Sequence, residues 1–368
     1  MKIGKIFMIS KTQARKILDY NLTDILKYVI EINQNRCDNN ITYSRNIFLP
    51  LTHICQNNCG YCTFKQTPEK AQYILMNESE IHNQLKIAQQ YNCKEALYTF
   101  GENADTIDIV KDKLKEYGYE SMVDYVYNLS HDTLTKYNIL PHTNMGIITH
   151  DELKQLKQVN ASMGLMLETT NRKLLNTIVH KDSPGKDPKK RLRYIKQAGI
   201  EQIPFTTGLL IGIGETFNDH IDSLFEIKKL HEKYGHIQEI IIQNFKPKPG
   251  IAMENYKEPN LVDLMKLVIV AKLIFKDTLS IQIPPNLNRQ LMPFFILAGA
   301  DDVGGISPVS LDYVNPEAPW PEIDKLKDEI RSINYKMVER LAVYDKFIKK
   351  EYLNDLVYEK ASYLRNKI

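Results

Sequence analysis

Short β-branched and apolar runs alternate with longer helical patterns along most of this chain. The runs that predict strands occupy residues 47–53, 95–102, 139–145, 161–169, 203–213, 237–245 and 279–285, with a less regular one at 301–306. Strands and helices that alternate in this way favour parallel pairing with crossover helices. Runs such as LLIGI and IIIQNF suit strands that are covered on both faces. Seven or eight units of this kind fit a (β/α) TIM-type barrel better than an open sheet.

Capping residues predict where individual helices begin and end. Asn77 starts an Asn-Glu-Ser-Glu capping box for a helix that runs to about Tyr91, and another helix is expected near 106–117. Asp187 can cap a helix with Pro188 in its first turn and Gly199 just after its end. We expect an α/β fold with an N-terminal helical extension (1–40), a barrel (41–320) and a C-terminal helical extension (321–368).

Charge and hydropathy exclude several classes of protein. The net charge of +3 is too small to indicate binding to nucleic acid or to an anionic membrane. The sequence has no apolar run near the ~20 residues that cross a bilayer, and its first residues do not form a secretory signal. We therefore expect a cytoplasmic, reducing location, where clustered cysteines bind metal or react more often than they form disulfides.

Three of the five cysteines fall within the segment HICQNNCGYCTF, residues 53–64. Cys55, Cys59 and Cys62 have the spacing Cys-x3-Cys-x2-Cys, whereas Cys37 and Cys93 are isolated. The segment follows the first predicted strand, at the end of a barrel where catalytic groups are found. A 4Fe-4S cluster is usually held by four thiolates, so three would leave one iron open for a small molecule. Zinc with His53 as the fourth ligand, and unligated thiols, are the alternatives.

The pattern Cys-x3-Cys-x-aromatic-Cys, with Tyr61 as the aromatic residue, resembles the signature of the radical S-adenosylmethionine superfamily. This resemblance implies a 4Fe-4S cluster whose open iron binds the amino and carboxylate groups of S-adenosylmethionine. It further implies that an electron from the cluster cleaves the sulfonium bond and releases methionine and a 5′-deoxyadenosyl radical.

Three further segments resemble S-adenosylmethionine-binding motifs of that superfamily. YTFGEN (98–103) would contact the methionine amino group through Gly101 and Glu102, although it could equally be a turn with a solvated carboxylate. GLLIGIGE (208–215), with Gly208, Gly212 and Gly214, would approach the adenine, or it is a buried strand and turn. GLMLETTNRKL (164–174) would place Glu168 on the ribose and Arg172 on the carboxylate, or these two residues form a salt bridge.

Other polar residues at predicted strand ends are candidate substrate contacts, although each taken singly is more often structural. They are Thr206, Thr207, Gln243, Asn244, Gln282, Asn286, Asp301 and Asp302. Together they suggest a substrate rich in hydrogen-bonding groups. The most basic stretch, HKDSPGKDPKKRLRYIK (180–196), is interpreted as a solvated loop and first helical turn.

Longer segments narrow the resemblance. Five of them are similar to the family of 7,8-didemethyl-8-hydroxy-5-deazariboflavin synthase subunit 1. They are YSRNIFLPLTHICQNNCGYCTF, IPFTTGLLIGIGET, LHEKYGHIQEIIIQNFKPKPG, IQIPPNL and ADDVGGISPVSLDYVNPEAPWPEI. That likeness implies a radical lyase that closes the deazaflavin ring on a hydroxybenzyl-ribityliminouracil adduct and releases ammonium. It also implies two partners, a sister radical subunit 2 that makes the adduct and a low-potential electron donor.

Other interpretations of the cysteine loop remain open. The sister subunit itself, a menaquinone-pathway-type radical enzyme, and a non-enzymatic zinc or iron–sulfur scaffold would all accommodate it.

Overall fold

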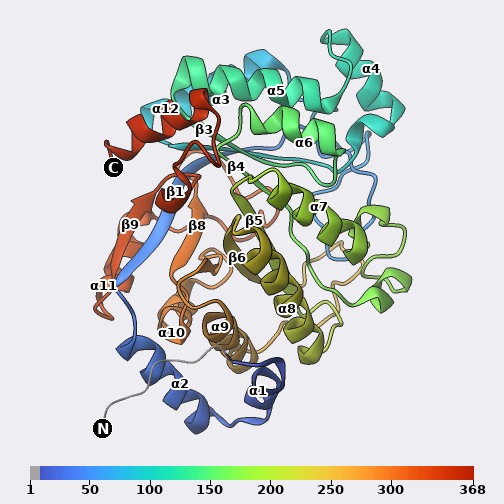
Figure 1. The fold of residues 1–368 in the computed structure, drawn as a ribbon. Coiled ribbons are helices and arrows are strands. Elements are labelled where there is room, and N and C mark those ends of the chain that lie inside the picture. The colour runs from blue at the N-terminus through green and yellow to red at the C-terminus, as the bar shows by residue number, and fades with distance from the viewer. Residues whose placement is uncertain (1–8) are drawn as a thin grey trace.

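The computed structural model describes residues 9–368, and its centre is a closed barrel of eight parallel strands (Figure 1). Each strand pairs with the next along the chain, and β1 pairs with both β2 and β8, which closes the barrel. The strands are β1 (Asn40–Leu49), β2 (Glu95–Thr99), β3 (Leu140–Asn144), β4 (Ser162–Gly164), β5 (Phe205–Ile211), β6 (Ile237–Asn244), β7 (Ser280–Gln282) and β8 (Asp302–Ile306). All eight predicted strands are confirmed, and the predicted barrel with them.

Helices connect the strands and cover the outside of the barrel (Figure 1). They are α3 (Glu78–Gln90), α4 (Asp108–Glu116), α5 (Met122–Asp132), α6 (His150–Lys157), α7 (Pro188–Ile200), α8 (Phe217–Tyr234), α9 (Leu261–Phe275) and α10 (Met292–Ala298). The capping box at Asn77 and the cap at Asp187 are confirmed. Gly199 lies inside the last turn of α7 rather than after it. A Cβ there would lie 2.8 Å from Tyr234 and His236, so the glycine permits close packing.

The N-terminal helices α1 (Lys11–Lys16) and α2 (Leu22–Gln34) pack against the outer surface of the barrel's own helices. α1 contacts α8, and α2 contacts α9 and α10. α9 is mostly apolar and is buried from Leu264 to Phe275, which is expected of a helix covered on all sides. The N-terminal segment therefore supplies the cover that α9 requires. Residues 1–8 of the predicted extension lie outside the described residues.

The C-terminal segment contains a strand that the sequence interpretation missed. Between α11 (Ile323–Arg331) and α12 (Asp355–Arg365) lies β9 (Lys336–Arg340), which pairs in parallel with residues 40–44 of β1. β2 pairs with the later part of β1, so β9 extends the barrel wall at the N-terminal end of β1. After β9, the apolar residues Leu341, Val343 and Phe347 belong to one buried cluster with Leu140, the first residue of β3. The expected C-terminal helical extension at 321–368 therefore contains two helices and, between them, a strand that was not predicted.

Within residues 9–368, no helix has both the length and the apolar content that crossing a membrane requires.

Candidate active site

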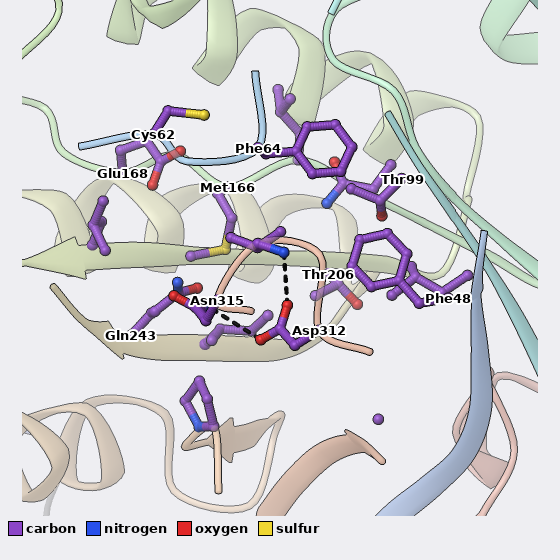
Figure 2. A pocket seen from close by; sticks show the side chains of 18 of the residues that line it. Phe48, Cys62, Phe64, Thr99, Met166, Glu168, Thr206, Gln243, Asp312 and Asn315 are labelled. Carbon is purple, nitrogen blue, oxygen red and sulfur yellow. Dashed lines mark hydrogen bonds between the residues drawn. The ribbon is translucent and has the colours of Figure 1, made fainter. Parts of the chain in front are cut away.

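The three clustered cysteines lie on the loop that follows β1, and all three line one cavity of about 380 Å³. Cys62 and Glu168 lie on the same side of this cavity (Figure 2). Backbone bonds fix the loop: the Gln56 amide donates to the Glu102 carbonyl over 3.1 Å, and the Cys62 amide donates to the Cys59 carbonyl over 3.1 Å. Cys37 is exposed and Cys93 is buried elsewhere. The structure therefore places the predicted triad on one cavity and the other two cysteines away from it.

The environment of the cysteines favours ligation over a free thiolate. Burial raises the pKa of the Cys55 thiol and of the Cys62 thiol, so each thiolate needs a compensating positive ligand to form. His53 does not line the cavity. Its Nδ1 lies 2.9 Å from the Phe64 carbonyl oxygen, and its ring packs beside that phenylalanine and Tyr313. The zinc interpretation therefore lacks its proposed fourth ligand on this cavity.

Gly101 and Glu102 follow β2 and lie directly against the cysteine loop. A Cβ on Gly101 would lie 1.8 Å from the Ile54 carbonyl oxygen, so only glycine fits. The buried Glu102 carboxylate accepts hydrogen bonds from Asn57 Nδ2 at 2.8 Å and from Arg191 Nη2 at 3.0 Å. Both predicted residues therefore line the cavity, and the carboxylate is held in a fixed position.

Glu168 follows β4 and lies on the cavity in the left-handed backbone region, with φ 65°. Its carboxylate accepts a hydrogen bond from Lys186 Nζ at 2.6 Å. Burial alone would raise the pKa of Glu168, but Lys186 and Arg191 hold it below its usual value, so the group is ionised. The same lysine lies 5.8 Å from the ring centre of Tyr61. A strained acid, a buried cation and the aromatic residue of the cysteine motif therefore share one side of the cavity.

The glycine-rich segment at the end of β5 is shaped by close contacts. A Cβ on Gly208 would lie 2.4 Å from the Ile241 carbonyl oxygen, and Gly212 and Gly214 have φ of +98° and +108°. The Glu215 carboxylate accepts hydrogen bonds from the backbone amides of the turn. Leu210 is the residue of this segment that lines the cavity. The glycines therefore set the path of the backbone next to the cavity.

Arg172 is not brought to the cavity. Its side chain is 53% exposed, and Nε lies 3.5 Å from the Asp187 carboxylate. Two other cations of this region do line the cavity, namely Lys186 and Arg191, with side chains only 13% and 3% exposed. Both come from the basic stretch 180–196, whose interpretation as a solvated loop is wrong for these two residues. The signal that could have found them is their position after Glu168, where buried acids require partners.

The opposite wall of the cavity carries a network of amide and acid groups (Figure 2). Asp312 accepts hydrogen bonds from Asn286 Nδ2 at 2.7 Å and from Asn315 Nδ2 at 3.0 Å, and Lys248 Nζ donates to Asn315 Oδ1 over 2.7 Å. Of the predicted substrate contacts, five line the cavity: Thr206, Gln243, Asn244, Gln282 and Asn286. Three do not, namely Thr207, Asp301 and Asp302. The last two pair with Lys272 and Arg340.

The floor of the barrel is closed by Arg340 at the end of β9. Its guanidinium donates to Asp302 over 2.6 Å and 3.0 Å and to Glu239 Oε2 over 3.0 Å. Thr206 and Tyr344 also donate to Glu239, over 2.7 Å and 2.9 Å. Burial raises the pKa of Glu239 to about 7 despite the neighbouring arginine. The cavity thus ends on a compact charged cluster.

Known proteins resemble this chain over most of its length. Residues 49–227 match the Radical SAM superfamily. The chain is 51% identical over 354 residues to 7,8-didemethyl-8-hydroxy-5-deazariboflavin synthase from Methanocaldococcus jannaschii, covering 96% of this chain and 98% of the relative. It is 54% identical over 321 residues to the enzyme of the same name from Methanothermobacter thermautotrophicus, covering 87% of this chain and 96% of the relative.

Solved structures show the same fold at much lower identity. Methylornithine synthase superposes with a TM-score of 0.70 at 17% identity, covering 90% of this chain and 95% of that one. The FeFe-hydrogenase maturase HydG from Carboxydothermus hydrogenoformans gives 0.71 at 16% identity, covering 98% and 86%.

Radical SAM proteins use a 4Fe-4S cluster and S-adenosylmethionine, and the cavity fits both. Three cysteines line it, the glycine at 101 allows the second strand to approach their loop, and buried carboxylates and cations face the same space. These ligands match an open-site cluster and a zwitterionic amino acid group beside it. The chain therefore belongs to the 7,8-didemethyl-8-hydroxy-5-deazariboflavin synthase family of the radical SAM superfamily.

Proposed function

We propose that this chain forms 7,8-didemethyl-8-hydroxy-5-deazariboflavin from 5-amino-5-(4-hydroxybenzyl)-6-(D-ribitylimino)-5,6-dihydrouracil. The reaction consumes S-adenosylmethionine and releases methionine, 5′-deoxyadenosine and ammonium. Ring closure oxidises the adduct by two electrons, and S-adenosylmethionine accepts them when it is converted to methionine and 5′-deoxyadenosine. The observation that carries the proposal is the 51% identity, over 96% of this chain, to a synthase of this name.

The cysteine side of the cavity would bind the cofactors. Cys55, Cys59 and Cys62 would hold the cluster, which supplies the electron that cleaves the sulfonium bond. The fixed Glu102 carboxylate would accept hydrogen bonds from the methionine amino group. Lys186 would pair with the methionine carboxylate, since its ammonium group lies on the cavity and is protonated. Burial opposes that charge, but Glu168 raises the pKa of Lys186 above its usual value.

The glycine-rich turn and Glu168 would position the nucleoside part of S-adenosylmethionine. Leu210 offers an apolar surface beside the turn, which suits the face of adenine. The ionised Glu168 carboxylate suits the ribose hydroxyls, which donate hydrogen bonds. The enzyme's contribution is to hold the cleaved bond and the substrate close together and to exclude water.

The proposal includes two partners and a location. A sister subunit would supply the adduct, a low-potential donor would reduce the cluster, and both would meet this chain in the cytoplasm. The amide side chains of Gln243 and Asn244 line the cavity, which supports a substrate that presents many hydrogen-bonding groups.

The test is anaerobic reconstitution of the cluster, followed by reduction in the presence of S-adenosylmethionine and the adduct. We expect 5′-deoxyadenosine and the fluorescent deazaflavin to appear together. Deoxyadenosine without deazaflavin would contradict the proposed substrate. Formation of the adduct from tyrosine and ribitylaminouracil would instead assign this chain the activity of the sister subunit.

The cysteine triad is tested separately by substitution. Cys55→Ala, Cys59→Ala and Cys62→Ala should each abolish both products, because each removes one of the three cluster ligands. Cys37→Ala and Cys93→Ala are the matched controls and should retain activity, since neither residue lines the cavity. Iron content and visible absorbance report cluster loading in each variant. Full activity in any of the first three would refute the three-thiolate site.

A further inference from the structure

The inner end of the cavity, below the cysteine loop, is lined by polar side chains from four strands. These side chains are all buried, and they belong to Asn46 on β1, Glu95 on β2, His142 on β3 and Gln282 on β7. Asn46 and Glu95 are direct neighbours in the parallel pairing of β1 with β2. We refer to these four residues as the inner pocket. A polar lining so deep inside a barrel is unusual, because barrel interiors are normally filled by branched apolar side chains.

The inner pocket holds hydrogen-bonding capacity that the protein does not use. Within residues 9–368, no side chain donates a hydrogen bond to the Glu95 carboxylate and no cation lies within ion-pair distance of it. Asn46 Oδ1 is buried and has no hydrogen-bond partner among the same residues. Leaving a buried polar atom such as Asn46 Oδ1 unpaired costs about 1–3 kcal/mol. A bound ligand that donates hydrogen bonds would remove that cost.

Glu239, the acid at the floor of the barrel, is a buried carboxylate whose hydrogen-bonding capacity is used by other side chains. Glu239 receives hydrogen bonds from Arg340, Thr206 and Tyr344. Glu95 has no comparable partners, although it borders the same cavity. The contrast separates the two acids by role: Glu239 belongs to the structural cluster of the floor, whereas Glu95 is open to a ligand.

Glycines allow the side chains of the inner pocket to lie close to the backbone of neighbouring strands. A Cβ on Gly305 would lie 2.2 Å from Asn46 Nδ2, and one on Gly304 would lie 2.2 Å from Gln282 Nε2. A Cβ on Gly164 would lie 3.0 Å from His142 Nε2. The other ring nitrogen, Nδ1, lies 2.7 Å from Ser162 Oγ, which fixes the ring. The two amides and the imidazole are therefore held in place by close glycine contacts.

We infer that the inner pocket binds the ribityl chain of the substrate and of the deazaflavin product. The inference rests on the proposed function, since it assigns one part of that substrate to one part of the cavity. Each hydroxyl of a polyol both donates and accepts hydrogen bonds, which suits a lining of one carboxylate, two amides and an imidazole. The hydroxyphenyl end has only one polar group and would leave most of this lining unpaired.

The position of the inner pocket relative to the cysteines supports the same orientation. The bonds that change during ring closure must lie near the cysteine loop, at the outer end of the cavity. The ribityl chain takes no part in that chemistry, so it can occupy the deep end. Phe48, Leu97 and Ile241 also line the cavity, and their apolar side chains suit a planar ring system. Contacts to a part of the substrate that does not react can hold the reacting part in position.

The test compares two ligands on the reconstituted protein. One is 7,8-didemethyl-8-hydroxy-5-deazariboflavin, and the other is its analogue with a methyl group in place of the ribityl chain. Binding is measured by fluorescence polarisation under anaerobic conditions. Glu95→Gln should weaken binding of the ribityl ligand about 10- to 100-fold, the effect of losing hydrogen bonds to a charged group. Binding of the methyl analogue should change less than about twofold.

Two further variants make the comparison independent of folding. Gln282→Met keeps the side-chain length but removes the amide, and it should weaken only the ribityl ligand, by about five- to tenfold. Glu116→Gln, at the exposed end of α4, is the matched control and should change neither affinity. Glu95→Gln keeps the size and shape of a side chain that makes no hydrogen bond or ion pair to another described residue, so we expect it to fold as well as the wild type.

The outcomes separate this inference from the proposed function. If the wild type binds both ligands equally, or if Glu95→Gln weakens both by the same factor, the ribityl assignment is overturned while the proposed function stands. If the wild type binds neither ligand and makes no deazaflavin, the proposed function fails and the inference fails with it. Selective loss of the ribityl ligand in both variants supports the assignment.

Discussion

Arg340→Met is the most informative perturbation of the barrel floor. The guanidinium makes two hydrogen bonds to Asp302 and one to Glu239, and the side chains of all three residues are less than 10% exposed. The methionine keeps most of the volume but leaves two buried carboxylates without their cation. Breaking a buried ion pair from one side costs about 3–5 kcal/mol, and we expect a loss of stability in that range.

The loss should depend on pH, because Glu239 can take up a proton. Burial raises the pKa of Glu239 in the folded protein to about 7, above its ordinary value of 4.5. A carboxyl group with a raised folded-state pKa contributes stability that is fully present below its unfolded pKa and is lost as the pH rises through the folded value. Removing Arg340 raises that pKa further. Arg340→Met should therefore cost more at pH 8 than at pH 6, by at most about 1.4 kcal/mol per pH unit.

Urea unfolding followed by circular dichroism at the two pH values measures both effects. The control is the triple variant Arg340→Met, Glu239→Gln, Asp302→Asn, which removes the charges together and should recover most of the lost stability. A loss below about 1 kcal/mol for the single variant, or an equal loss at both pH values, would refute the reasoning. Failure of the triple variant to recover stability would show that packing of the arginine stem, and not its charge, holds the floor.

Two further predictions concern the cofactor side of the cavity. Gly101→Ala should lower the iron content of the reconstituted protein severalfold, because its Cβ would lie 1.8 Å from the Ile54 carbonyl oxygen and displace the cysteine loop; normal iron content would contradict this. Lys186→Met should weaken S-adenosylmethionine binding at least about tenfold by equilibrium dialysis, the effect of losing a charged hydrogen bond. Arg172→Met, whose partner is Asp187 at the surface, is the matched control and should bind normally.

The sequence predicts the barrel and the cysteine site well for a common reason. Each barrel strand is a local apolar run, and the cysteines are close neighbours along the chain, so local patterns contain the information. Helix caps such as Asn77 are also local, and the structure confirms them. Gly101 and Glu102 follow a strand directly, which places them at the same end of the barrel as the cysteine loop.

What the sequence did not reveal depends on contacts between distant segments. Lys186 and Arg191 lie in a run of charges that is typical of a solvated surface, and only their pairing with Glu168 and Glu102 identifies them as buried. β9 is short and carries charged residues at both ends, so it lacks the apolar run that marks the other strands. Its place is set by pairing with β1, and that pairing leaves no local pattern.

The pairing of β9 with β1 also constrains how the protein is made. Tyr43 and Glu339, which hydrogen-bond across this pair, are 296 positions apart. At a synthesis rate of about 5–20 residues per second, the first strand waits about 15–60 seconds for its neighbour. During that interval the edge of β1 is unpaired and Arg340 is absent from the end of the barrel. An unpaired strand edge favours association with other chains. Insertion of the cofactors into a complete cavity must therefore wait until β9 has been synthesised and has paired with β1.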